Sequence, residues 1–224
     1  STSLYFSYTS SFEPNFQARQ ESGEQFEPTT GRLFEGGIKQ SFLNERVLAT
    51  LAVYQLERQN VLVPDPNNFL FSLQTGEQRS RGIELEINGQ VSPGLSLNGT
   101  YSAIDAIVTE DPRAVYLGDR LVGVPKHSGG IYANYIFDER VLRGFSVGGG
   151  IYFATEQFSN LPNKTFTLPG YTRADVNFGY RRENWRFDLA VKNLNDVRYF
   201  ETGGFNSILP QAKRHAIATD TYSF

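Results

Sequence analysis

The sequence predicts an all-β protein, an antiparallel transmembrane β-barrel of about ten strands. Two observations carry this prediction. Segments of about ten residues alternate between apolar and polar residues, and the connections between them alternate between short and long. In the strand expected at 95–108, for example, Leu95 and Leu97 alternate with Ser96 and Asn98. Strands of this kind meet lipid on one face and water on the other.

The connections set the order of the elements and the two rims of the sheet. We expect strands near 3–10, 32–42, 46–58, 80–91, 95–108, 126–138, 144–156, 169–181, 184–195 and 213–224. The short connections are Leu43-Asn44-Glu45, Ser92-Pro93-Gly94, Asp138–Arg143 and Arg182-Glu183, and the long ones are 11–31, 59–79, 109–125, 157–168 and 196–212. Short periplasmic turns opposite long external loops are typical of outer-membrane barrels, whereas soluble β-sandwiches mix loop lengths less regularly.

The early strands follow one another without a leader. Ser1 leads directly into the strand-like run 3–10, so no signal peptide is recognised and we expect the sequence to begin within a fold. In the strand at 80–91, Ile83 and Leu85 face away from Glu84. A Lys or Arg at mid-bilayer costs roughly 2–4 kcal/mol, so the charged rows are expected to point into a lumen and to pair across neighbouring strands.

The central strands are rich in glycine. Gly129-Gly130 lies in the strand at 126–138 and Gly148-Gly149-Gly150 in the strand at 144–156. A nucleotide-binding loop is a poor interpretation of the triple glycine, because no helix signal and no Lys-Ser/Thr follows it. We expect instead that these glycines relieve curvature or allow close packing against a neighbouring strand.

The last three strands keep the same phase, with one exception. Val176 faces away from the charged row that contains Arg173 and Asp175. The terminal Tyr222-Ser223-Phe224 resembles the signal by which the outer-membrane assembly machinery recognises bacterial barrels. Asp220 interrupts the lipid-facing row of the final strand. Either the register shifts locally, or this end of the strand faces protein or lipid headgroups.

Composition agrees with a barrel and excludes other classes. The 224 residues are 20% charged with a mean hydropathy of -0.38, and no run of about 18 apolar residues is present, which excludes a helical membrane protein. Aromatic residues reach 14%, as membrane-interface girdles require. The net charge of -3 provides no basic patch for nucleic acid, and the absence of cysteine excludes disulfides and thiolate sites.

No metal or catalytic motif stands out. His127 and His215 each begin an expected strand, and neither has the ligand spacing of a metal site. A self-closed ten-strand barrel could be an outer-membrane protease, for which Asp111, Asp119 and His127 are the nearby candidates. Pairing of the first strand with the last would favour that alternative.

Several motifs, in order along the chain, resemble one family. They are Ser11-Phe12-Glu13-Pro14, Phe34-Glu35-Gly36-Gly37-Ile38-Lys39, Gln74–Glu86, Val124-Pro125-Lys126-His127-Ser128, Leu168-Pro169-Gly170-Tyr171 and Asn193-Leu194-Asn195-Asp196-Val197-Arg198-Tyr199-Phe200. Together they resemble the C-terminal barrel portion of a TonB-dependent siderophore receptor of the ferrichrome and hydroxamate type. The family usually carries cysteines in its last loop, and Glu201–Ala212 has none.

The resemblance implies a 22-stranded barrel in the outer membrane of a Gram-negative bacterium, closed by an N-terminal plug domain. It implies a receptor that takes up ferric siderophores with energy delivered through TonB, and not an enzyme. Residues 1–224 would then be the C-terminal part of one barrel domain, with the plug absent from this chain, and strands 3–10 and 213–224 would be edges that pair with further chain. Iron would arrive already chelated, so no cofactor is expected.

A ferric siderophore needs a concave site with aromatic walls and a few polar groups. The candidates in the long loops and upper strand ends are Phe69, Phe71, Tyr116, Phe158, Phe166, Tyr199 and Phe205, with Arg113 and Arg120 as cations that could attract an anionic chelate. A receptor of the same architecture for cobalamin or haem remains the alternative. Only binding separates these cargoes.

Overall fold

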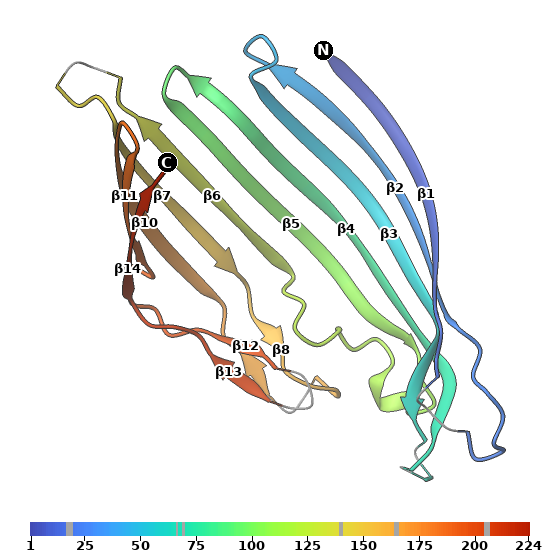
Figure 1. Ribbon diagram of the computed structural model, residues 1–224. Coiled ribbons are helices and arrows are strands. Elements are labelled where there is room, and N and C mark those ends of the chain that lie inside the picture. The colour runs from blue at the N-terminus through green and yellow to red at the C-terminus, as the bar shows by residue number, and fades with distance from the viewer. Residues whose placement is uncertain (17–19, 66, 69, 139–140, 164–165, 204–206) are drawn as a thin grey trace.

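The protein forms one curved antiparallel sheet of ten long strands, in the order β1-β2-β3-β4-β5-β6-β7-β10-β11-β14 (Figure 1). The computed structural model describes residues 1–16, 20–65, 67–68, 70–138, 141–163, 166–203 and 207–224. The bounds are Thr2–Glu13 (β1), Thr29–Phe42 (β2), Val47–Pro64 (β3), Ser72–Ser92 (β4), Leu95–Glu110 (β5), His127–Ile136 (β6), Phe145–Ala154 (β7), Tyr171–Arg182 (β10), Trp185–Lys192 (β11) and His215–Tyr222 (β14). Each corresponds to one expected strand, so the prediction of an antiparallel all-β sheet is confirmed.

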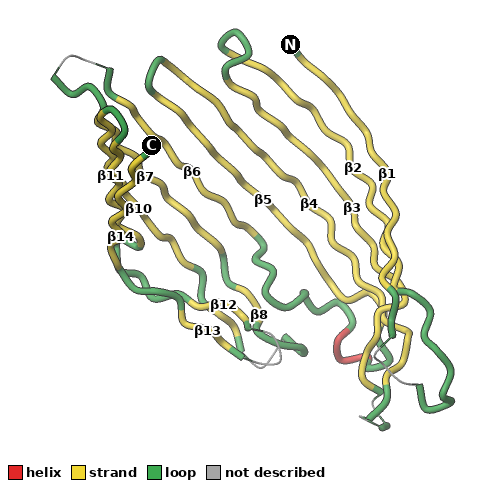
Figure 2. The backbone as a smooth tube through the Cα atoms, in the orientation of Figure 1, coloured by secondary structure: helices red, strands yellow, loops and turns green. Residues whose placement is uncertain are grey.

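The sheet is an open arc with two rims. The short turns lie at one rim, together with both ends of the chain, and the long connections lie at the other (Figure 2). Strand β1 pairs with β2 alone and β14 with β11 alone, so the first and last strands do not pair with each other. The pairing that would have favoured a self-closed ten-strand enzyme is therefore not formed.

The sheet has an apolar face and a polar face, set by the register. Cross-strand pairing places Ile38, Leu51, Leu85 and Tyr101 in one row on the apolar face. Large side chains on this face are exposed, among them Phe6 with an exposed fraction of 72%. An apolar surface this extensive indicates contact with lipid, because soluble monomers rarely expose such a patch.

Aromatic pairs border the apolar face at both ends. The Tyr8 and Phe34 rings lie 4.9 Å apart towards the loop rim. Towards the turn rim, the Trp185 and Tyr222 rings also lie 4.9 Å apart. Aromatic rings favour the membrane–water interface because their bodies are apolar and their edges polar. These two pairs occupy the positions expected for membrane-interface girdles.

Asp220 keeps its place in the apolar row. The β11–β14 register runs without a shift from the Trp185–Tyr222 pair to the Lys192–His215 pair, and Phe187 lies opposite Asp220. The alternative of a local register shift is therefore wrong. Asp220 lies two residues from Tyr222, at the end of the strand where lipid headgroups can solvate its carboxylate.

The connections at the loop rim contain more structure than expected. The long connection predicted at 59–79 is wrong in extent, because β3 runs to Pro64 and β4 begins at Ser72. β-branched Val61 and Val63 continue the ladder beyond a bulge, in which Asn60 adopts a φ of 57°. The later loops contain the hairpins β8 (Gln157–Phe158) with β9 (Thr167–Leu168) and β12 (Phe200–Thr202) with β13 (Ile208–Pro210), and a 3-10 turn η1 (Ala114–Tyr116).

The described residues include no helix long and apolar enough to cross a membrane.

Glycines on the polar face accommodate tyrosine rings. Tyr5 faces Gly37 across the ladder, and Tyr152 faces Gly130. A Cβ added at Gly130 would lie 2.5 Å from the Tyr152 ring, and one at Gly37 would lie 2.6 Å from the Tyr5 ring. The rings therefore lie flat on the wall where the neighbouring strand has no side chain, which confirms the expected close packing at Gly130.

Candidate ligand-binding site

A hollow of about 620 Å³ lies on the polar face near the loop rim. Its wall comes from β5, β6, β7 and β10, and the hairpin β12–β13 borders it on the loop side. Tyr152, Tyr171 and Arg173 project from the wall, and Glu201 and Thr202 come from the hairpin. The hollow therefore combines aromatic faces with one guanidinium and one carboxylate.

Arg173 is the cation of this hollow, and tyrosine rings surround it. Its Nη1 donates a hydrogen bond of 2.9 Å to Tyr199 Oη, and its guanidinium carbon lies 4.9 Å from the centre of the Tyr152 ring. The Tyr171 and Tyr199 rings make a tilted contact, with ring centres 4.4 Å apart and an interplanar angle of 34°. The planar guanidinium is thus oriented by a hydrogen bond and by cation–π contact.

Asp175 connects Arg173 to the end of β11. Its Oδ1 lies 3.3 Å from Arg173 Nε and its Oδ2 lies 3.2 Å from Lys192 Nζ. The same Oδ1 accepts a 2.9 Å hydrogen bond from the Asn193 backbone N–H. Only 6% of Asp175 is exposed, so its charge is balanced by these cations rather than by water.

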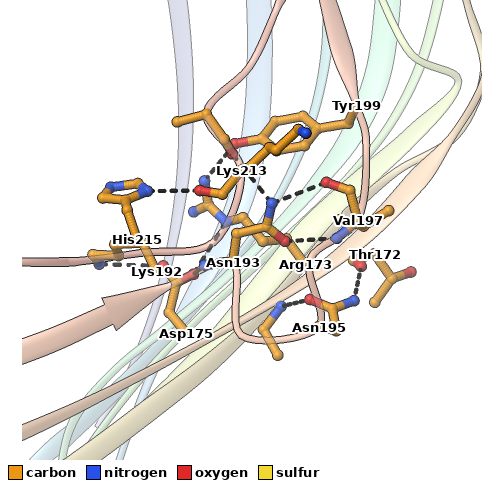
Figure 3. Close-up of polar contacts among 12 residues, drawn as sticks. Thr172, Arg173, Asp175, Lys192, Asn193, Asn195, Val197, Tyr199, Lys213 and His215 are labelled. Atoms are coloured by element: carbon orange, nitrogen blue, oxygen red, sulfur yellow. Dashed lines mark hydrogen bonds and ion pairs between the residues drawn. The ribbon is translucent and has the colours of Figure 1, made fainter.

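Asn193 positions the segment that carries Tyr199 (Figure 3). Its side-chain Nδ2 donates to Val197 O (2.9 Å) and to Ala212 O (3.1 Å), while its Oδ1 accepts from Val197 N (2.9 Å). Asn193 is 1% exposed and has a φ of 54°, which ends β11 and turns the chain back over the wall. Asparagine tolerates this left-handed conformation better than most residues.

Asn195 attaches the same turn to β10. Its Oδ1 accepts a 3.0 Å hydrogen bond from Ala174 N, and its Nδ2 donates a 2.8 Å bond to Thr172 O (Figure 3). The near-terminal motif Asn193-Leu194-Asn195-Asp196 is therefore a structural clamp that holds Tyr199 against Arg173. The clamp closes because both asparagine side chains satisfy backbone groups that the end of a strand leaves unpaired.

The neighbouring loops are joined to one another beside the hollow. Asn163 N–H donates to Asp119 Oδ2 at 2.9 Å, and Asn163 Nδ2 donates to Arg120 O at 3.0 Å. The Gly123 N–H donates to Phe158 O at 3.0 Å. These bonds connect the segment after η1 to the hairpin β8–β9, so the loop rim is a cross-linked layer.

The predicted site residues fall into several places. Tyr199 contacts Arg173 and Tyr171 but does not itself line the hollow, and Phe158 belongs to the adjoining hairpin β8–β9. Arg113 packs 4.2 Å over the Tyr116 ring in the η1 loop, away from the hollow's lining. Phe71 lies at the start of β4 and Phe166 beside β9, and neither lines the hollow. Phe69 and Phe205 lie outside the described residues.

Arg120 points to the other side of the wall. It pairs with Ile107 in an isolated bridge, and its Nη1 lies 3.8 Å from Asp105 Oδ1 on the apolar face. It therefore does not join Arg173. His127 and His215 begin β6 and β14 as expected, and among the described residues no group of three or more His, Asp or Glu side chains is placed to hold a metal ion.

Sequence reasoning missed Tyr152, Tyr171 and Arg173. Alternation already assigned Arg173 to the polar face. Alternation does not show how close Arg173 lies to the loops. The register between β7 and β10 and the fold of the β12–β13 hairpin decide which polar-face residues lie under the loops.

Lowering the pH is expected to loosen the η1 loop through Asp111. Burial raises the pKa of Asp111, but hydrogen bonds from the side chain and backbone of Arg113, and its charge, lower it more, so the net pKa is below the ordinary value. The pair's stabilisation is complete above the unfolded pKa of about 3.9 and is lost as the pH falls through the lower folded value. Hydrogen exchange at Arg113, corrected for intrinsic rates, should show this loss, and Asp111→Asn should abolish the pH dependence.

Comparisons with known proteins agree with this architecture. A family model described as "TonB dependent receptor-like, beta-barrel" matches residues 1–194. The chain is 37% identical over 199 residues to the metal-pseudopaline receptor CntO of Pseudomonas aeruginosa, covering 88% of this chain and 28% of that receptor. It is 33% identical over 229 residues to the ferrichrome outer membrane transporter/phage receptor of Escherichia coli K12, covering 98% and 30%. The chain thus spans about three tenths of the length of these relatives.

Solved structures show the same fold. The siderophore receptor PiuA from Acinetobacter baumannii superposes with a TM-score of 0.84 at 25% identity, covering 99% of this chain and 34% of that one. The P. aeruginosa receptor FpvA, solved in complex with a heterologous ferric pyoverdine, superposes with a TM-score of 0.83 at 24% identity, covering 100% and 31%. The relatives are receptors and transporters rather than enzymes, which is evidence against an outer-membrane protease.

Proposed function

Because the chain belongs to the family of TonB-dependent receptor β-barrels, which lie in the outer membrane, we propose that it forms the C-terminal part of the barrel of a ferric-siderophore receptor. In this proposal the receptor imports the chelate with energy delivered through TonB, which contacts a plug region carried by another part of the protein. Residues 1–224 belong to one barrel domain. The open edges at β1 and β14 pair with further strands, because unpaired backbone in lipid costs several kcal/mol per group.

The observation that carries the proposal is the placement of Arg173 beside Tyr152 and Tyr171 in a hollow below the loops, with its guanidinium held by the Tyr199 hydroxyl. A ferric siderophore is bulky, and its metal is already surrounded by the chelate's own oxygens. The protein needs only aromatic walls and a few oriented polar groups, and Arg173 can donate to those oxygens. Iron itself needs no ligand from the protein, so no resident cofactor is required.

The cargo class is tested by titrating the intact receptor. We expect ferric hydroxamates to quench its tyrosine and tryptophan fluorescence at micromolar or lower concentration, and cobalamin and haem to leave it unchanged. Quenching by cobalamin or haem alone would assign the receptor to that cargo instead. The absence of quenching by any hydroxamate would exclude the hydroxamate subtype.

Replacing Arg173 by glutamine is expected to weaken chelate binding about ten-fold or more. A hydrogen bond to a charged group contributes roughly 1.5–3 kcal/mol, and 1.4 kcal/mol corresponds to a factor of ten. Arg186→Gln is the matched control, because Arg186 lies on the same polar face in a 2.6 Å pair with Asp188 but near the turn rim. Equal affinities of the two variants, measured by the same titration, would remove Arg173 from the site.

A further inference from the structure

Of the described residues that line the hollow under the loops, two are charged, and their charges are balanced differently. Arg173 comes from β10 and has a carboxylate 3.3 Å away, that of Asp175, which it shares with Lys192. Glu201 comes from β12 and is exposed, and no described Lys, Arg or His side chain forms an ion pair with it. Its carboxylate accepts a hydrogen bond of 3.3 Å from Gln211 Nε2. The negative charge of Glu201 is therefore uncompensated within the described part of the chain.

A second polar side chain of the hollow has no partner. Gln157 begins β8 and lines the hollow, yet only 9% of its surface is exposed. Across the described residues, no donor or acceptor makes a hydrogen bond to its side-chain amide. Burying an unbonded amide is costly, because the amide gives up its hydrogen bonds to water. We therefore expect the Gln157 amide to bond to a ligand that enters the hollow.

Gly123 joins the two hairpins that carry these side chains. Its backbone N–H donates a 3.0 Å hydrogen bond to the carbonyl oxygen of Phe158, the residue after Gln157. A Cβ added at Gly123 would lie 2.5 Å from Cγ2 of Thr202, the residue after Glu201. Glycine suits this position because its φ is 74° and the Thr202 side chain occupies the space. Gln157 and Glu201 therefore line the loop side of the same hollow.

The unpaired groups on the loop side are those that a protonated primary amine requires. An ammonium group has three N–H donors and no acceptor, so it bonds to carboxylate and carbonyl oxygens. Glu201 supplies a carboxylate and Gln157 an amide oxygen. Hydrogen bonds to ionised groups are roughly twice as strong as those between neutral groups. Arg173, in contrast, attracts anionic oxygens, so the hollow has a negative loop side and a positive wall side.

We propose that Glu201 and Gln157 select a ferric chelate that carries a protonated amine outside its metal-binding groups. The ammonium group is bound by Glu201 and Gln157, while the oxygens that surround the iron face Arg173. The two ends of the hollow thus fix the orientation of the cargo. A chelate of similar size without the amine leaves the Glu201 carboxylate unpaired beside it, which lowers its affinity. This inference rests on the proposed transport function and defines one chemical feature of its cargo.

The test compares two ferric chelates that differ only in this amine. Ferrioxamine B is a linear trihydroxamate that ends in a primary amine, and acetylation of the amine removes its charge while leaving the iron-binding groups intact. Fluorescence quenching of the full-length receptor measures both affinities. We expect ferrioxamine B to bind about ten-fold or more tightly than its N-acetyl derivative, as a charge-assisted hydrogen bond predicts.

Substitutions at the two residues are expected to reduce this preference. Glu201→Gln should bring the ratio of the two affinities close to one, by weakening the binding of ferrioxamine B about ten-fold. Glu201→Asp keeps the charge and should retain part of the preference. Gln157→Leu removes the amide oxygen and should lower the preference about three-fold. The thermal unfolding midpoint of the receptor in detergent checks that each variant is folded.

Glu13→Gln is the matched control. Glu13 is another exposed carboxylate at the loop rim, but it lies on the edge strand β1 and pairs with Arg58 at 3.4 Å. This variant should keep the full preference. Equal affinity for the two chelates, or a preference that persists unchanged in Glu201→Gln, would overturn the inference and leave the transport proposal intact. Binding of neither chelate would exclude a hydroxamate cargo, and the amine site with it.

Discussion

Replacing Asn193 by alanine is expected to release the Tyr199 segment from the wall and to weaken chelate binding about ten-fold or more. The substitution removes three side-chain hydrogen bonds, to Val197 N, Val197 O and Ala212 O. Each contributes roughly 1 kcal/mol, and the backbone groups left behind are partly buried. The Tyr199 hydroxyl then no longer accepts the hydrogen bond from the Arg173 guanidinium. Cargo titration measures the affinity, and hydrogen exchange at Val197 measures the local opening.

Asn44→Ala is the matched control for this prediction. Asn44 has nearly the same left-handed φ, 56° against 54°, but it is exposed in the turn at the opposite rim. Its replacement imposes the same backbone strain without touching the clamp. If both variants bound cargo equally, the hydrogen-bond network of Asn193 would have no part in positioning Tyr199. If only Asn193→Ala lost affinity, the clamp would be established.

Gly130→Val is expected to displace Tyr152 and to destabilise the wall by roughly 1–3 kcal/mol, the usual cost of overpacking. The Cβ at position 130 would lie 2.5 Å from the Tyr152 ring and 3.1 Å from the Ile151 carbonyl oxygen. Since the backbone cannot move without breaking the ladder, the ring must leave the wall. It then loses its position beside Arg173, and chelate affinity falls together with the stability measured by denaturant unfolding of the receptor in detergent.

Gly99→Val provides the comparison. Gly99 lies across the ladder from Ile131, next to Gly130 in space, but on the apolar face. A Cβ there meets nothing closer than 3.9 Å, so the added side chain projects into lipid. Unfolding midpoint and chelate affinity should stay unchanged for Gly99→Val. A loss of stability as large as that of Gly130→Val would show that β-branching alone, and not the Tyr152 contact, is responsible.

Sequence reasoning was most accurate where the signal was local. The alternation located all ten long strands and assigned Ile83, Leu85 and Glu84 to their correct faces. It was less accurate at the loop rim, where β3 and β4 continue as a hairpin into the connection predicted at 59–79. A strand that does not face lipid needs no alternation between apolar and polar residues. β-branched residues such as Val61 and Val63 therefore extend a strand without a periodic signature.

At the binding site, too, sequence reasoning succeeded for some residues and failed for others. Tyr199 was predicted, but Arg173 was noted only as one of a charged row, and Arg120 was placed among the ligand candidates. In the structure Arg173 projects into the hollow, whereas Arg120 joins Asp105 on the opposite face. The segment after η1 pairs with β5 and turns Arg120 outward, and no periodicity in a loop sequence encodes that pairing.

By itself the sequence determined the strands, their two faces and the rim from which the long loops extend. These follow from a period of two and from the positions of turn residues, which are properties of neighbouring residues in the chain. Only the tertiary structure decided that Arg173 meets Tyr152 and Tyr199, and that Arg120 joins Asp105 on the opposite face. Those groupings depend on register between strands and on loops that fold back, so they join residues far apart in the chain.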